Sequence, residues 1–73
     1  MRTLAFPIRG EFITLDRLLK ATGLADSGGQ ARMMIVDGLV EVDGAPESRE
    51  TAKIRPGQGV TLGEVRIQIQ GEA

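Results

Sequence analysis

Length and composition restrict this chain to a small domain that is held together by its apolar core. Its 73 residues are enough for one domain, and a chain of this size buries only about 60% of the surface that its unfolded form exposes. The absence of Cys and His excludes a disulfide framework, a thiolate metal site and the commonest general base. Nine basic and ten acidic residues give a net charge of −1, which argues against nucleic-acid binding unless the positive charges gather locally.

The apolar stretches are far shorter than the roughly 20 residues that span a bilayer. The beginning of the chain also lacks the continuous apolar segment of a signal peptide. We therefore expect a soluble protein that stays in the cytoplasm.

The first segment, residues 3–14, has the weak alternation of apolar residues that is typical of strands. Pro7 and Gly10 interrupt it, so we expect an edge strand or extended segments. Phe6 and Phe12 are the only aromatic residues of the chain, and we expect both to lie in the core. No Trp or Tyr is available for stacking on a base.

The next segment has helical spacing. Four residues fall on one face at i, i+3, i+4 and i+7: Leu15, Leu18, Leu19 and Thr22. Thr14 is positioned to cap this short helix, and Gly23 ends it. Arg17 and Lys20 lie three residues apart and therefore share an outer face.

A second short helix follows the loop of residues 23–26. Ser27 can accept a hydrogen bond from the Gln30 N–H while the Gln30 side chain reaches back to Ser27, which is a capping box. Three residues then line the inner face, and Arg32 points away from them: Ala31, Met34 and Ile35. Asp37 and Gly38 end the helix.

From residue 39 the apolar period changes to two. Residues 39–43 are expected to form a strand with Val40 and Val42 inward, and Asp43-Gly44 supplies the positive φ angles of a turn. The remaining expected elements are a returning strand over 47–54, a turn over 55–59, and strands over 60–62 and 65–69. The fold class that follows is α+β, with two short adjacent helices packed on a small, mostly antiparallel sheet.

No group of residues has the composition of a catalytic site. Ser27 has no His to activate it, and its role as a helix cap explains it together with Gln30. We therefore expect no enzyme activity, no cofactor, no metal and no small-molecule substrate.

Two features favour binding, although each has a purely structural alternative. Gly28 and Gly29 leave backbone N–H groups uncovered at the start of the second helix, where a phosphate could bind; the alternative is simple helix initiation, and Asp26 would repel an anion. Six of the nine basic residues lie on elements that could adjoin, and they either form one basic face or simply solvate the surface. They are Arg17, Lys20, Arg32, Arg49, Lys53 and Arg55.

An ordered set of residues between positions 15 and 60 resembles a known family. The set is Leu15-Asp16, Leu18-Leu19, Gly23-Leu24, Ser27, Gln30-Ala31-Arg32, Ile35, Gly38, Val40, Val42, Gly44 and Lys53-Ile54-Arg55-Pro56-Gly57. It resembles the RNA-binding domain named after the fourth protein of the small ribosomal subunit. Residues 26–32, 37–44, 47–49 and 53–54 are similar to its small standalone bacterial branch, called YbcJ-like.

The resemblance implies a single domain over 1–73 with an αL motif over about 15–60, a helix–helix–strand unit that docks on folded ribosomal or transfer RNA. It also implies association with the ribosome and recognition by shape and phosphate contacts. Since the chain has no Trp or Tyr, we expect recognition without stacking. The implied contacts are Arg17, Lys20, Ser27, Gly28, Gln30, Arg32, Arg49, Lys53 and Arg55. Ser27 and Gln30 could instead act only as caps.

This chain departs from many family members at two places, and both departures remove attraction for phosphate. Gly28 and Gly29 stand where a basic residue commonly follows the serine, and Asp43 stands where Asn commonly precedes the turn glycine. An alternative reading is a protein-interaction module that docks on a ribosomal or RNA-processing partner. It would use the acidic residues Asp37, Glu41, Asp43, Glu47 and Glu50.

Overall fold

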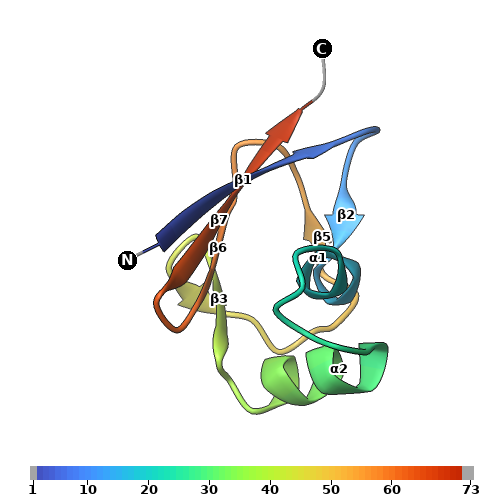
Figure 1. Cartoon of the computed structure of the whole chain (residues 1–73), viewed down its shortest axis with the longest axis vertical. Helices are drawn as coiled ribbons and strands as arrows, with labels where there is room; N and C mark the ends of the chain where they lie inside the picture. The colour runs from blue at the N-terminus through green and yellow to red at the C-terminus, as the bar shows by residue number, and fades with distance from the viewer. Residues whose placement is uncertain (1, 72–73) are drawn as a thin grey trace.

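The computed structural model of the chain describes residues 2–71, in which two adjacent helices lie beside the strands (Figure 1). The elements in chain order are β1 (Arg2–Ile8), β2 (Ile13–Thr14), α1 (Leu15–Ala21), α2 (Gly28–Val36), β3 (Val40–Val42), β4 (Ala45–Pro46), β5 (Lys53–Ile54), β6 (Gly59–Leu62) and β7 (Val65–Gly71). Neither helix of the described residues is long and apolar enough to cross a bilayer.

Five strands form the main sheet, in the order β1-β7-β6-β3-β4. All neighbours are antiparallel except β1 and β7, which run parallel with Arg2 opposite Val65 and Ile8 opposite Gly71. β1 lies at the edge, as its proline predicted, because Pro7 has no N–H to donate to a further strand. The predicted α+β fold with a mostly antiparallel sheet is confirmed.

The predicted returning strand over residues 47–54 is wrong. The chain returns earlier, as β4, which pairs with β3 and ends at Pro46. Residues 47–52 then leave the main sheet, and Lys53–Ile54 pairs with Ile13–Thr14 in a separate two-stranded sheet. Residues 47–52, which join β4 to β5, therefore run from the main sheet past the start of α1.

The core lies between the helices and the inner face of the strands, and it is entirely aliphatic. Its buried members are Ile8, Leu15, Leu18, Leu19, Ala25, Ala31, Ile35, Val40, Ala52, Ile54, Val60, Ile67 and Ile69. Phe6 is half-buried against this core, but the expectation that Phe12 belongs to it is wrong, because Phe12 is 39% exposed. Phe12 comes just before the two-residue strand β2, where the short β2–β5 sheet is too small to cover a large side chain.

The turn after β3 has the positive φ angles that Asp43-Gly44 predicted, 51° and 85°. The Asp43 carboxylate accepts hydrogen bonds from the Gly59 N–H and from Nε2 of Gln58, each at 3.0 Å. These two bonds and the nearby Arg66 charge hold the pKa of Asp43 below its ordinary value, with the Gly59 bond contributing most. Asp43 therefore fastens the β3–β4 turn to the start of β6.

Because the pKa of Asp43 is lowered on folding, its ionisation stabilises the fold above the unfolded value of about 3.9. This contribution is lost as the pH falls through that value toward the lower folded pKa. We expect the difference in unfolding free energy between the wild type and Asp43→Asn to be larger at pH 7 than at pH 3, measured by urea denaturation. A difference that stays constant over this range would show that the charge of Asp43 contributes nothing.

Candidate nucleic-acid interface

The first helix presents two positive charges on its outer side. Leu15, Leu18 and Leu19 are completely buried, so the opposite face of α1 is turned to solvent, and Arg17 and Lys20 lie on it, both exposed. Lys20 also lies in the last turn of α1, where the helix dipole favours a cation.

The first backbone N–H groups of α1 are bonded to segment 47–52 and not to the predicted Thr14 cap. The Thr14 side chain makes no capping hydrogen bond. Instead, the Leu15 N–H donates to the Ala52 carbonyl and the Asp16 N–H to the Glu50 carbonyl, both at 3.0 Å. This crossing places the basic residues after position 48 beside the first turn of α1.

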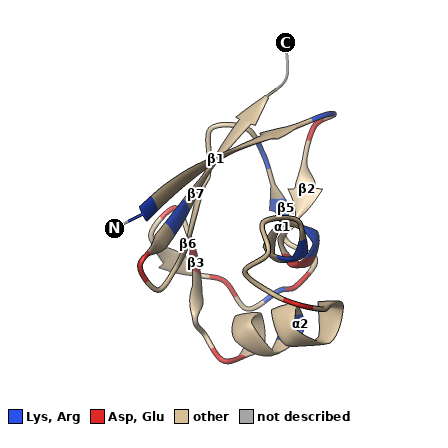
Figure 2. Ribbon diagram, in the orientation of Figure 1, with Lys and Arg blue, Asp and Glu red and all other residues tan. Residues whose placement is uncertain are grey.

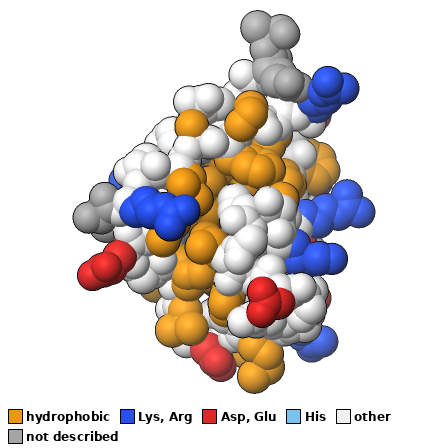
Figure 3. All heavy atoms as spheres, in the orientation of Figure 1, with side chains coloured by type: hydrophobic (Ala, Val, Ile, Leu, Met, Phe, Trp, Pro, Cys, Tyr) orange, Lys and Arg blue, Asp and Glu red, His pale blue; other side chains and the backbone are white. Residues whose placement is uncertain are grey.

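Lys53 and Arg55 extend the basic surface from α1. Lys53 pairs with Thr14 across the β2–β5 sheet, so it lies next to the start of α1. Figure 2 shows the basic residues of α1, of β5 and of the segment that follows β5 on the same side of the molecule. In the space-filling view, Lys and Arg side chains project along the edge that carries α1 and β5 (Figure 3).

The second helix begins with the predicted cap in modified form. The Ser27 hydroxyl accepts from the Gln30 N–H at 3.1 Å, as expected. The Gln30 side chain does not reach back to Ser27, because its Oε1 accepts from the Asp26 N–H instead. Ser27 and Gln30 thus have capping roles, while their exposed positions leave them accessible to a ligand.

The two glycines at the start of α2 are not required by the backbone. Neither has a positive φ, and a Cβ atom would meet nothing within 4 Å at Gly28 and only Ser27 Oγ at 3.9 Å at Gly29. Glycine is less favourable than alanine in a helix, so the fold gains nothing from either residue. Their effect is to leave the first amides of α2 open to solvent.

Two of the six predicted basic contacts are paired with acidic residues. Arg32 Nε lies 3.4 Å from Glu50 Oε2, and Arg49 Nε lies 2.9 Å from Glu47 Oε1. Over residues 2–71, the other four make no ion pair: Arg17, Lys20, Lys53 and Arg55. The candidate site therefore consists of four unpaired cations with two partly neutralised arginines beside them.

The structure also neutralises part of the acidic surface that would support a protein-interaction module. Glu47 and Glu50 are engaged by the arginines, and Asp43 is engaged by the turn. Asp37, Glu41 and Asp43 make no ion pair among residues 2–71 and keep their negative charges.

Comparison with known proteins identifies the family of this chain. The model of the S4 domain matches residues 6–70. The chain belongs to the S4 domain family. The match includes both helices and segment 47–52, so the family resemblance found in the sequence is confirmed.

Two proteins that resemble this chain come from bacteria. The protein of Escherichia coli K12 named "Putative RNA-binding protein YbcJ" is 42% identical over 57 residues, which is 78% of this chain and 81% of YbcJ. A YbcJ protein of Shigella flexneri matches equally, with the same identity and coverage. The YbcJ-like branch predicted from the sequence is therefore confirmed.

The solution structure of Escherichia coli YbcJ has the same fold, with a TM-score of 0.64 and 37% identity over 96% of this chain and 87% of that one. That structure was described as revealing an αL motif involved in RNA binding. This S4 domain thus has an RNA-binding fold of the αL type. Its family is one of RNA-binding domains and not of enzymes, which agrees with the predicted lack of catalysis.

The sequence analysis did not predict that Phe12 lies in this region. The Lys53 ammonium lies 5.0 Å from the centroid of the Phe12 ring, in cation–π contact. Residues 12 and 53 are far apart in the sequence, and no local sequence pattern predicts their contact.

Proposed function

We propose that this protein is a non-catalytic module that binds structured RNA, ribosomal or transfer RNA, in the bacterial cytoplasm. Support comes from four cations without an acidic partner on α1, β5 and the turn after β5. A net charge of −1 leaves little general attraction for RNA, so binding depends on this local surface. We propose that the protein binds its RNA on a ribosomal subunit.

In the proposed complex, the side chains of the basic surface neutralise backbone phosphates of a folded RNA. They are Arg17, Lys20, Lys53 and Arg55, with Arg32 and Arg49 at their margin. The open amides of Gly28 and Gly29 approach a further phosphate, because no side chain stands between them and the solvent. Ser27 and Gln30 complete this end of the site, and recognition is by shape.

The experiment is binding of the purified protein to total bacterial RNA and to purified ribosomal subunits at about 50 mM and about 200 mM salt. We expect binding at the lower salt that weakens steeply at the higher salt. Retention on heparin distinguishes the alternative, since a module that docks through acidic residues on a protein should flow through. Absence of RNA binding at low salt would refute the proposed function.

Arg32 can be tested by exchanging it with its partner. Arg32→Glu should weaken RNA binding and lower the free energy of unfolding by less than about 1 kcal/mol, because an exposed ion pair contributes little. The exchange variant Arg32→Glu/Glu50→Arg re-forms the pair with its charges reversed. It should recover stability in urea denaturation but not RNA affinity. Recovered affinity would show that position 32 makes no phosphate contact of its own.

Gly28→Ala separates stability from binding at the start of α2. The substitution should raise the free energy of unfolding by up to about 1 kcal/mol, because alanine is the better helix former and has room there. The same methyl group should hinder a phosphate from approaching the open amides and so lower RNA affinity. Urea denaturation and RNA titration of one preparation measure both effects, and unchanged affinity would exclude phosphate contact at this amide.

A further inference from the structure

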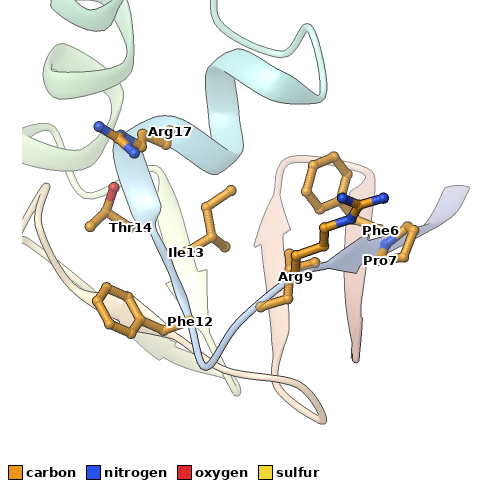
Figure 4. A pocket seen from close by; sticks show the side chains of 8 residues that line it. Phe6, Pro7, Arg9, Phe12, Ile13, Thr14 and Arg17 are labelled. Atoms are coloured by element: carbon orange, nitrogen blue, oxygen red, sulfur yellow. The ribbon is translucent and has the colours of Figure 1, made fainter. Parts of the chain in front are cut away.

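A groove lies beside the basic surface, between the end of β1 and the β2–α1 segment. Its volume is about 360 Å³, within the range of about 300 to 1,000 Å³ typical of small-ligand sites. Figure 4 shows Phe6 and Arg9 on the β1 side, Phe12, Thr14 and Arg17 on the other, and Ile13 between them. The groove therefore has apolar walls and basic residues on both sides.

Both aromatic residues of the chain line this groove. Neither belongs to the buried core, in which every side chain is aliphatic. Phe12 is 39% exposed, and the Lys53 ammonium over its ring brings a positive charge to the edge of the groove. An exposed aromatic face beside a cation is the arrangement that stacks on a nucleic-acid base while holding its phosphate.

The polar lining of the groove also fits a nucleotide. The Thr14 side chain does not cap α1, so its hydroxyl can exchange hydrogen bonds with a ligand. Arg17 makes no ion pair among residues 2–71. The acidic residues nearest in the sequence, Glu11 and Asp16, are not among the lining residues.

We propose that this groove holds one unpaired base of the RNA that docks on α1 and α2. The inference rests on the proposed function and adds stacking to it, since the base would pack against Phe12 and the wall at Phe6. Arg17 lies on both surfaces, so the phosphate next to the unpaired base continues the path of the docked backbone. The preferred RNA is a helix interrupted by a bulged nucleotide.

The test measures the affinity for a fully paired RNA hairpin and for a series of variants of that hairpin. Each variant carries a single bulged uridine, at a different position along the stem. The wild type should bind the best bulged hairpin about five- to 150-fold more tightly, which is the effect of stacking one base. Phe12→Leu keeps an apolar side chain but has no ring. It should bind every hairpin as tightly as the wild type binds the paired one.

Photocrosslinking of the wild type gives a second readout that does not depend on a variant. A 5-iodouridine at the bulge should crosslink to tryptic peptide 10–17, which contains Phe12, or to peptide 3–9, which contains Phe6. Equal binding of paired and bulged hairpins, or crosslinks confined to other peptides, overturns the groove proposal and leaves the proposed function standing. Failure of every hairpin and of total RNA to bind overturns both.

Discussion

Replacing Arg17 and Lys20 by glutamine together is expected to weaken RNA binding more than any other change that leaves the fold intact. Each lost phosphate contact lowers the slope of log affinity against log salt by about 0.7 to 0.9. Two lost contacts therefore lower it by about 1.4 to 1.8, which at about 0.1 M salt corresponds to about 25- to 60-fold weaker binding. Titration of total RNA at several salt concentrations measures both quantities.

The matched control is Arg2→Gln/Arg66→Gln, which removes the same net charge from another part of the surface. Arg2 and Arg66 are exposed on β1 and β7. Figure 2 shows the basic residues of these two strands away from the side that carries α1 and β5. This control should change the salt slope by much less. If both double variants lose affinity equally, RNA responds only to net charge, and α1 is not the contact surface. The Arg17→Gln/Lys20→Gln variant should unfold within about 0.5 kcal/mol of the wild type, since surface substitutions usually do. The control should lose slightly more stability, because it also removes the Arg66 charge near Asp43.

The largest effect on stability is expected for Ile67→Ala. Ile67 is completely buried in β7, opposite Leu4 of β1 and Val60 of β6. The truncation should cost about 2 to 5 kcal/mol through lost burial and a cavity. A domain of this length has about 4 to 11 kcal/mol in total, so the variant should be partly or largely unfolded at 37 °C.

Urea denaturation followed by far-ultraviolet circular dichroism measures this loss. Gln70→Ala is the control on the same strand, because Gln70 is exposed, and it should change stability by no more than about 0.5 kcal/mol. A loss below about 1 kcal/mol for Ile67→Ala would mean that the sheet closes over the missing methyl groups. The packing between β1, β7 and β6 would then be loose enough to adjust to a smaller side chain.

The features that could be predicted from the sequence depend on residues close together in the chain. The Ser27 cap needs only the Gln30 amide three residues later, and the Asp43-Gly44 turn needs only its own positive φ angles. The alternation along β7 likewise shows its buried face directly, with Ile67 and Ile69 turned inward. Each of these signals is local, and tertiary structure does not override it.

The features that could not be predicted depend on residues distant in sequence. The β2–β5 sheet has two residues in each strand, too few to show a period of two. The Arg32–Glu50 pair depends on the path of segment 47–52, which leaves the main sheet after Pro46 and runs beside the start of α1. The sequence thus indicated which residues are basic, but not which of them remain unpaired.

The position of β7 determines when a nascent chain can complete this fold. It is the last described strand to be synthesised, yet it lies between β1 and β6 and pairs with both. β1 is synthesised before the other described strands, but it has no strand to pair with in the main sheet until residues 65–71 are available. The β1–β7–β6 part of the main sheet must therefore assemble after residues 65–71 have been translated, whereas β4, β3 and β6 can pair earlier. Until then, β1 and β6 expose edges that other chains could join.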